Sequence, residues 1–370
     1  QVRLYAELGA GLGLHAVSPV GRLDDRAGRA AVLAALPAEA LTPERLERAI
    51  HPAVARIQAR IMARKRVAGQ HTFGARPAKP PVTVVIPLYR QYGFLRHQIQ
   101  AFARDPDLRE ADIVYVLDRP EDTETVERAL ADCHRVFGVA MRLIVCGTNY
   151  GFAGACNLGA LLAKGRHLVF LNSDVVPSSP GWLSAWRAAH TEAGERVGVS
   201  GVRLHFPDGS LQHAGLYFEQ DLMPWWTNHH RAKGLPPDAP GARAVSWTPA
   251  VTGAAAMIQR KLFRRLGGFN EGYVIGDFED SDLCMAAVAA GFTNLYVGTV
   301  ALDHVERASV RHNTAYWGTA AARYNGWLHT RRWGAQIAAL AERGRGRADV
   351  PAAAGTGAPT AESDRVRAAS

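Results

Sequence analysis

Strand-like and helix-like patterns alternate along the middle of this 370-residue chain. Short apolar runs rich in β-branched residues predict buried strands, and apolar positions three or four residues apart predict the helices between them. The predicted strands cover 82–88, 112–118, 142–147 and 167–174, and the predicted helices cover 92–104, 123–137 and 152–164. Repeated strand–helix units of this length predict an α/β fold, in which helices cover both faces of a mostly parallel sheet.

The two ends of the chain carry different patterns. Apolar residues at helical spacing over 42–67 predict a helix that starts at Thr42-Pro43 and is kinked or split at Pro52. Prolines mark a linker before the first strand, and the Ala-, Gly- and Arg-rich end of the chain is typical of disorder. We expect a helical N-terminal extension with linker, a central domain, a C-terminal helical segment and a tail, over residues 1–80, 81–310, 311–343 and 344–370. The extension is open to three roles: a helical cap, a link to an upstream domain or a docking arm.

Composition narrows the class of protein. Hydrophobic residues make up 48% and charged residues 21% of the chain, which excludes a mostly disordered protein and a disulfide scaffold. The four cysteines have no CxxC spacing, so we expect reduced thiols and a cytoplasmic location. No apolar run is long enough to cross a bilayer, and the first residues do not resemble a signal peptide. The net charge of +9 favours a polyanionic partner, such as a nucleotide phosphate, a nucleic acid or an anionic membrane face.

The common nucleotide-binding fingerprints are missing from the sequence. No GxxxxGK[ST] motif occurs, which excludes a P-loop enzyme, and the nearest approach to GxGxxG lacks its last glycine. Polar residues instead follow the predicted strands, where ligands of parallel sheets bind. These residues are Tyr89, Asp118, Asn149 and Asp174.

Four motifs occur in a fixed order along the central domain. They are Asn149-Tyr-Gly-Phe-Ala-Gly-Ala-Cys-Asn157, Asn172-Ser-Asp174, Gly276-Asp-Phe-Glu-Asp-Ser-Asp-Leu-Cys284 and Leu302-Asp-His304. In these motifs the chain resembles the inverting family 2 glycosyltransferases of GT-A fold. The resemblance is greatest to the bacterial rhamnosyl- and galactofuranosyl-transferases of surface polysaccharides. It implies transfer of a sugar from a UDP- or dTDP-sugar to a hydroxyl of a glycan, a lipid-linked acceptor or a protein.

The resemblance also implies a divalent metal site. Departure of a nucleoside diphosphate develops negative charge, which Mn²⁺ or Mg²⁺ neutralises. Asp174 and His304 match the family's metal ligands, although Asn172 stands where the family usually has an acid. The plain structural alternatives are a helix-capping aspartate and a buried histidine.

Donor-binding residues follow from the same resemblance. Asp118 matches the aspartate that reads the base, and the glycines of the 149–157 motif let the backbone approach the phosphates. A helix-capping turn is the structural alternative for this motif, and a turn residue is the alternative for Asp118. The implied nucleotide-sugar contacts are Pro87, Tyr89, Asp118, Asn149, Gly151, Phe152, Ala153, Asn157, Asn172 and Asp174.

Inverting transfer needs one general base for the acceptor hydroxyl. The resemblance assigns that role to Asp280, with Glu279 as the second candidate, and a solvated helix start as the alternative. On the acceptor side it implies His213, Trp247 and Gly253, the last two on one strand from 247 to 257.

Two other functions remain open at this point. A catalytically inactive relative that binds carbohydrate or nucleic acid would also use the positive charge, and a nucleotidyltransferase would use a related fold. We expect no nucleic-acid partner. The basic, aromatic segment from Tyr316 to Trp333 indicates either a peripheral membrane contact or a helix that packs on the domain.

Overall fold

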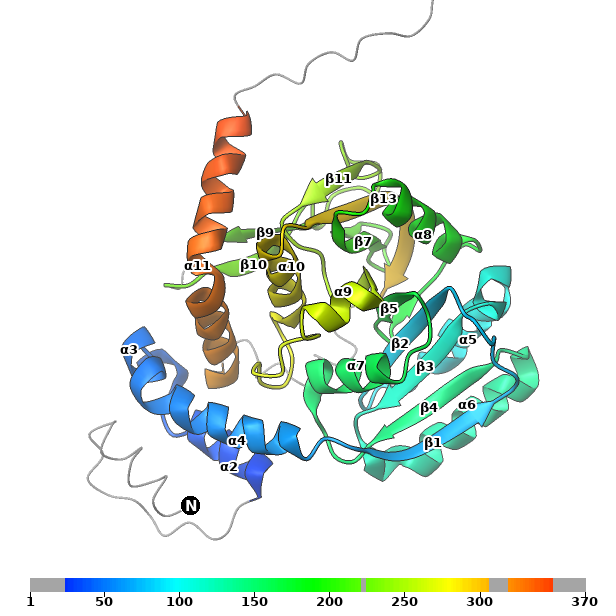
Figure 1. Ribbon diagram of the computed structural model, residues 1–370, viewed down its shortest axis with the longest axis horizontal. Helices are drawn as coiled ribbons and strands as arrows, with labels where there is room; N and C mark the ends of the chain where they lie inside the picture. Colours follow the sequence, from blue (N-terminus) through cyan, green and yellow to red (C-terminus); the bar gives the residue numbers. More distant parts are fainter. Residues whose placement is uncertain (1–23, 221–223, 306–318, 349–370) are drawn as a thin grey trace, which may run out of the picture.

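This computed structural model describes residues 24–220, 224–305 and 319–348 (Figure 1). One mixed sheet forms its centre, with the strand order β1-β4-β3-β2-β5-β12-β7-β13-β11. Two short strands, β6 and β8, pair with β13 and β7. The main strands are β1 Val67–Phe73, β2 Val82–Leu88, β3 Asp112–Leu117, β4 Met141–Cys146, β5 His167–Leu171, β7 Val197–His205, β11 Val245–Thr248, β12 Ala255–Gln259 and β13 Thr293–His304; the short ones are β6 Val175–Val176 and β8 Leu211–His213.

Helices cover both faces of this sheet, as predicted. On one face α5, α6 and α8 bury Ile99, Leu130 and Trp186 against the sheet, and on the other α2, α4, α7, α10 and α11 share a second hydrophobic core with it. The helices are α2 Asp25–Leu33, α4 His51–Ala63, α5 Leu95–Ala103, α6 Thr123–Phe137, α7 Gly151–Leu161, α8 Trp182–Glu192, α9 Arg260–Arg265, α10 Glu279–Ala289 and α11 Ala320–Ala348. The α/β fold class is therefore confirmed, and all four predicted strands and three predicted helices are present.

The strand order distinguishes one edge of the sheet as the place where a ligand is expected to bind. Strands β2, β3 and β4 are parallel, and each is placed beside the one before it on the same side of β2. Strand β5 is also parallel to β2 but pairs with its other side. The carboxyl ends of β2 and β5 therefore diverge at a topological switch point, where open α/β sheets bind ligands. Strand β12 runs antiparallel between β5 and β7, so its amino end, Ala255, lies beside Leu171 at the same edge. We call this edge the mouth of the sheet.

The N-terminal extension packs on the central domain. Its apolar residues Val32, Ile50, Val54 and Ile57 belong to the same core cluster as the sheet residue Val85. Residues 43–63 are helical without interruption: a π-helical turn, Leu46–Ile50, precedes α4, whose first turn contains Pro52. The proline therefore marks a change of helix type and does not split the helix as predicted. The extension is not purely helical, because β1 pairs antiparallel with β4 at the edge of the sheet. The remaining short elements are η1 Ala38–Ala40, α3 Pro43–Arg45, η3 Pro106–Arg109 and η4 Pro120–Asp122.

The C-terminal helix lies across the N-terminal helices and α10 (Figure 1). Tyr324 and Trp327 are buried, and the Arg331 guanidinium donates to the Glu47 carboxylate. Its aromatic residues are thus used in packing, as the second of the two readings expected. The helix reaches Ala348 and not residue 343. The described residues do not include Tyr316 and Trp317 of the basic, aromatic segment. They also do not include 349–370, the rest of the predicted tail.

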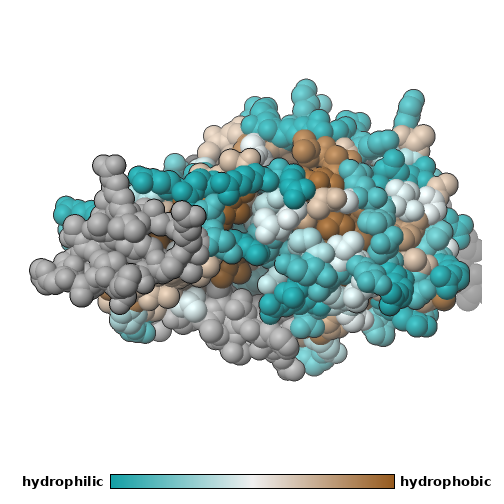
Figure 2. All heavy atoms as spheres, turned by 90° about the horizontal axis from the view of Figure 1, so that it is seen from below, coloured by the Kyte–Doolittle hydropathy of each residue, from teal (hydrophilic) through white to brown (hydrophobic). Residues whose placement is uncertain are grey.

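The surface and the thiols complete the description. All four cysteines are buried and free. Within the described ranges, no helix combines the length and apolar character that a membrane span requires. Seen from below, hydrophilic side chains predominate, and hydrophobic ones show between them near the upper centre of the view (Figure 2). A small second sheet, β9 Leu216–Glu219 with β10 Thr227–His230, flanks α11 and α10.

Candidate functional site at the mouth of the sheet

Three consecutive residues before β12 join the predicted site residues. The Thr252 N–H lies 3.5 Å from His213 Nε2, the Gly253 N–H donates to Asp280 Oδ2 at 2.8 Å, and the Ala254 carbonyl accepts from Asn172 N–H at 2.9 Å. The chain turns at Gly253 and Ala254, directly before β12, and its backbone groups there contact several strand ends at once. Residues far apart in sequence thus converge on one short segment.

The ends of β5 and β13 bring Asp174 and His304 together. His304 Nε2 lies 3.3 Å from Asp174 Oδ1, and both side chains are about 9% exposed. The Val305 N–H donates to the Asp174 carbonyl at 3.1 Å, which holds the two backbone segments side by side. On the other side of the ring, His304 Nδ1 lies 2.6 Å from Gln212 Oε1.

The hydrogen bond to Gln212 determines which nitrogen of His304 is protonated, and therefore which kind of ion His304 and Asp174 can bind together. Since Oε1 is an acceptor, Nδ1 carries the proton, and in the neutral ring Nε2 presents its lone pair to the Asp174 carboxylate. Two acceptors that face each other require a proton or a cation between them. A carboxylate oxygen and an imidazole nitrogen suit Mn²⁺, and the amide behind the ring orients it as in metal sites. Within the described ranges no cluster of three or more such ligands occurs.

The candidate bases lie at the start of α10. Asp280 is half-buried, and its carboxylate accepts from the N–H groups of Gly253 and Ser281 at 2.8 and 2.7 Å. Glu279 is only 3% exposed and accepts from the Asp277 N–H. Burial raises the pKa of both carboxyls, that of Glu279 well above its usual range. Of the two, Asp280 is the more accessible to an incoming ligand.

The loop before α10 is conformationally strained. Ile275, Asp277 and Phe278 have φ angles of 72°, 142° and 69°, in the region that favours glycine. Strain of this kind costs on the order of 1–3 kcal/mol per residue and is concentrated at functional sites. The strained turn ends at Phe278, directly before Glu279 and Asp280, and therefore sets where α10 begins.

The loop also meets the start of α7. Gly151 has a φ of 75°, and a Cβ there would lie 2.8 Å from the Ile275 carbonyl oxygen. The Phe152 N–H donates to that same oxygen at 3.2 Å. Asp118, at the end of β3, accepts from the Tyr150 and Gly151 N–H groups at 2.7 and 2.8 Å. Burial raises the pKa of Asp118 to about 7, while these two hydrogen bonds lower it.

Substitution of Gly151 tests this close contact. We expect Gly151→Ala to lower the free energy of unfolding by about 3 kcal/mol, because the alanine meets both an unfavourable φ and a backbone oxygen. Gly138, the C-cap of α6, is the matched control, since it has a φ of 71° and open space around it. Urea unfolding of Gly138→Ala should show a loss of about 1 kcal/mol. Equal losses in the two variants would contradict the predicted clash.

Asp282 joins α10 to the C-terminal helix, α11. Its buried Oδ2 accepts from Tyr273 OH at 2.8 Å, Arg332 Nε at 2.8 Å and Trp333 Nε1 at 2.7 Å. The sequence indicated only a first-turn acid at this position. The contacts show that α11 holds α10 in place, so the C-terminal helix supports the mouth without reaching it.

Loss of the Asp282 carboxylate should lower the stability of the fold. We expect Asp282→Ala to reduce the free energy of unfolding by about 2–4 kcal/mol, because four donors, Asn270 among them, lose their acceptor. The loss is limited because the charged partner Arg332 is 42% exposed and can be solvated. Glu47→Ala is the control, because its ion pair with Arg331 is about half exposed and should contribute below 1 kcal/mol. Thermal and urea unfolding measure both, and a loss below 1 kcal/mol for Asp282→Ala would refute the tethering role.

Three predicted residues lie elsewhere. Trp247 is 54% exposed on the edge strand β11, opposite Leu295 near the start of β13, whereas His304 ends that strand. The predicted strand over 247–257 is wrong, because it splits into β11 and β12 on different partners. The Asn157 amide is used by the Phe269 backbone and the Glu271 carboxylate. Ala153, on α7, is buried in the hydrophobic core.

The remaining predicted residues line the mouth at its β2 side or its centre. Tyr89 is 43% exposed after β2, Pro87 and Asn149 are half-buried, and the Phe152 ring lies against Gly253. His213 is buried, with Nδ1 3.0 Å from Nδ1 of His230. The Tyr92 hydroxyl donates to Asp122 at 2.7 Å and so ties the loop after β2 to the loop after β3.

Two polar residues that support the site were missed. Gln98 donates to the carbonyls of Asn172 and Val175 and thereby fixes the turn that carries Asp174. Gln212 orients His304. Gln98 had a sequence signal, because it is a polar residue on the apolar stripe of α5, whereas Gln212 had none outside its neighbour His213.

The fold and this mouth define an α/β domain with acids and a histidine at the switch point of its sheet. The sequence profile of the family described as Glycosyl transferase family 2 matches residues 83–267, half of the chain. The chain therefore belongs to glycosyl transferase family 2, and its central domain is a glycosyltransferase domain. The resemblance drawn from the four motifs is confirmed.

Relatives of known sequence support the same family. The O-antigen biosynthesis protein RfbC of Myxococcus xanthus is 27% identical over 67% of this chain and 19% of its own length. An N-acetylglucosaminyl-diphospho-decaprenol L-rhamnosyltransferase of Mycobacterium tuberculosis is 25% identical over 50% of this chain and 69% of its own length. An uncharacterized protein of Sinorhizobium fredii, y4gI, is 27% identical over 69% of this chain and 28% of its own length. The chain thus spans less than a third of two of these relatives.

Two solved structures are similar at a lower level. GalNAc-T7 with UDP, GalNAc and Mn²⁺ has a TM-score of 0.48 and 18% identity, over 61% of this chain and 44% of that one. The mannosyltransferase PcManGT from Pyrobaculum calidifontis, in complex with GDP-Man and Mn²⁺, has a TM-score of 0.45 and 18% identity, over 80% and 88%. Neither likeness defines a substrate for this chain.

Proposed function

We propose that this chain transfers a sugar, with inversion, from a UDP- or dTDP-sugar to a hydroxyl of a glycan or lipid-linked acceptor in polysaccharide biosynthesis. Family membership and the names of the O-antigen and rhamnosyltransferase relatives support the class of reaction. The contact of Asp174 with His304, at the mouth that also holds Asp280, is the observation that carries the proposal.

Asp174 and His304 are the proposed ligands of Mn²⁺ or Mg²⁺. The lone pair of His304 Nε2 and the Asp174 carboxylate face the same space, which is the arrangement a shared cation requires. When bound, the cation would neutralise charge on the departing diphosphate. Water and donor phosphates would supply the other ligands, as is usual for these ions.

The chain's own residues account for the rest of the reaction. Asp118 accepts from the N–H groups of Tyr150 and Gly151 and so holds the start of α7 at the mouth. The positive end of the helix dipole there favours the negative charge of the phosphates. Asp280 takes the proton of the acceptor hydroxyl. At the same time the hydroxyl oxygen bonds to the anomeric carbon, and the bond from that carbon to the diphosphate breaks. Two backbone donors hold the Asp280 carboxylate in place, and Glu279 lies behind it as a positioning residue.

Nucleotide binding tests the proposal directly. Calorimetric titration with UDP and dTDP should show binding that strengthens when Mn²⁺ is added, and EDTA should abolish hydrolysis of the preferred donor from a panel of UDP- and dTDP-sugars. A nucleotidyltransferase would bind a nucleoside triphosphate in preference, and an inactive relative would bind UDP without turnover. Failure to bind either nucleotide in the presence of Mn²⁺ would refute the proposed function.

A further inference from the structure

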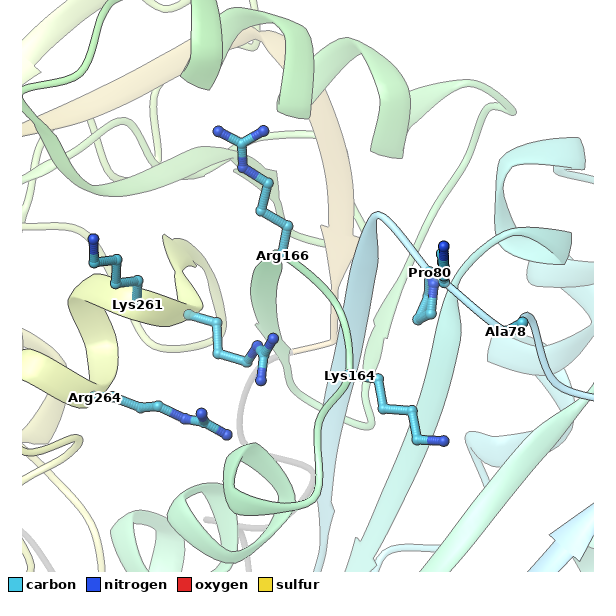
Figure 3. Close-up of a pocket in the computed structure, with 8 residues that line it drawn as sticks. Ala78, Pro80, Lys164, Arg166, Lys261 and Arg264 are labelled. Atoms are coloured by element: carbon cyan, nitrogen blue, oxygen red, sulfur yellow. The ribbon is translucent and has the colours of Figure 1, made fainter.

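A second, strongly basic pocket lies at the opposite edge of the sheet. It has a volume of about 460 Å³ and is lined by Ala78, Lys79, Pro80, Lys164, Arg166, Arg260, Lys261 and Arg264. Three segments form it: the linker before β2, the loop between α7 and β5, and α9 (Figure 3). Six of its eight lining residues are cationic and none is acidic.

This pocket is separate from the mouth. It lies at the amino ends of β2 and β5 and at the carboxyl end of β12, whereas the mouth lies at the other ends of the same strands. The seven residues of β2 span about 20 Å, which is the approximate separation of the two edges. A donor bound at the mouth therefore leaves the pocket open to another ligand.

Backbone carbonyls orient one of the pocket's cations, and, in the part of the chain that the structure describes, none of the six is neutralised by a carboxylate. Arg260 Nε donates to the Gly165 carbonyl at 2.7 Å, and its Nη1 lies 3.4 Å from the Ala163 carbonyl, so backbone groups orient the guanidinium. Arg264 extends from α9 towards the loop that carries Lys164 (Figure 3). Among the described residues, none of the six cations forms an ion pair with a carboxylate.

Unpaired like charges in one pocket repel one another, and an anion relieves this repulsion. Burial lowers the pKa of the adjacent His167 to about 4, with smaller contributions from Arg166 and Arg187, so this ring adds no charge beside the pocket near neutral pH. Guanidinium groups bind phosphate through paired N–H donors, and lysines add point charges. The residue set therefore matches phosphate better than a single carboxylate.

We propose that this pocket is a second, non-catalytic anion site that binds the phosphate groups of a phosphorylated ligand. Two sources share this chemistry, a soluble diphosphate and the headgroups of anionic lipids. The pocket acts independently of the donor, and in the second case it would orient the domain on a membrane surface.

The test compares two double variants that remove the same charge. Lys164→Gln/Lys261→Gln removes two exposed pocket cations, and Arg104→Gln/Arg109→Gln removes two exposed cations outside the pocket lining. Circular dichroism and thermal unfolding confirm that both variants fold. Metal-free protein is titrated with pyrophosphate by calorimetry, with and without UDP, and vesicles of phosphatidylglycerol or phosphatidylcholine are used in flotation.

We expect the pocket variant to bind pyrophosphate, phosphatidylglycerol vesicles or both at least tenfold more weakly than the wild type, and the control variant to match the wild type. Loss of pyrophosphate binding identifies a soluble ligand, and loss of vesicle binding alone identifies a lipid headgroup. Competition by UDP, equal binding by the two variants, or no binding of either probe to the wild type would overturn the proposal. Because no donor turnover is measured, these results are independent of the proposed glycosyl transfer.

Discussion

Replacing Asp280 by asparagine is expected to lower kcat for sugar transfer by about a thousandfold, because the amide cannot remove the proton from the hydroxyl of the acceptor substrate. The substitution keeps the shape of the side chain. Because the Gly253 and Ser281 N–H groups donate to different oxygens of the Asp280 carboxylate, one of them keeps an oxygen acceptor and the other meets the new amide nitrogen. The loss of one hydrogen bond should lower the melting temperature by about 5 °C or less. Donor turnover and transfer to acceptor are measured with the nucleotide and sugar that the donor panel identifies.

The control is Asp132→Asn, on an exposed face of α6, where Asp132 pairs with Arg135. It should leave kcat unchanged. Desolvation raises the pKa of Asp280, and protonation inactivates a base, so activity should fall as the pH drops through that raised pKa. The acidic limb of the pH–rate profile should accordingly lie at higher pH than for an exposed aspartate. Full activity of Asp280→Asn would show that another group is the base.

Replacing Asp174 by asparagine should weaken Mn²⁺ binding at least tenfold, about 1.4 kcal/mol, and reduce kcat/KM by about a hundredfold. The asparagine retains the volume but not the charge that faces His304 Nε2. Electron paramagnetic resonance of free Mn²⁺ measures the binding in the presence of UDP. Asp208→Asn removes the same charge from an exposed turn, where Asp208 accepts from Ser210, and should leave Mn²⁺ binding unchanged. Unaltered Mn²⁺ affinity in Asp174→Asn would exclude this carboxylate as a ligand.

Local patterns sufficed for the strands and for the edge where the site forms. The run from Val82 to Leu88 is continuously apolar because both faces of β2 are buried, and its end at Tyr89 marks the mouth. His304 follows Asp174 by 130 residues, so only the position of each at a strand end, together with the family resemblance, linked them. The structure places the two side chains in contact, so the two strand ends meet as expected.

Features that depend on distant partners were not predictable in this way. Strand β1 is half-exposed at the sheet edge and owes its form to pairing with β4, which lies about 70 residues further on. Asp282 reads as a helix-start acid, because its partners Arg332 and Trp333 belong to another helix. The break at 249–254 contains Pro249 and Gly253, which are local signals against a continuous strand, and it places Trp247 on β11 at the far edge of the sheet.

The central claim is that Asp174 and His304 bind one divalent cation at the mouth, where Asp280 is the general base for the acceptor hydroxyl. Anomalous diffraction from crystals grown with UDP and Mn²⁺ tests it most directly. The account predicts one manganese peak within coordination distance of an Asp174 carboxylate oxygen and His304 Nε2, with the diphosphate on its open side. A manganese peak bound to UDP but away from both side chains would contradict it.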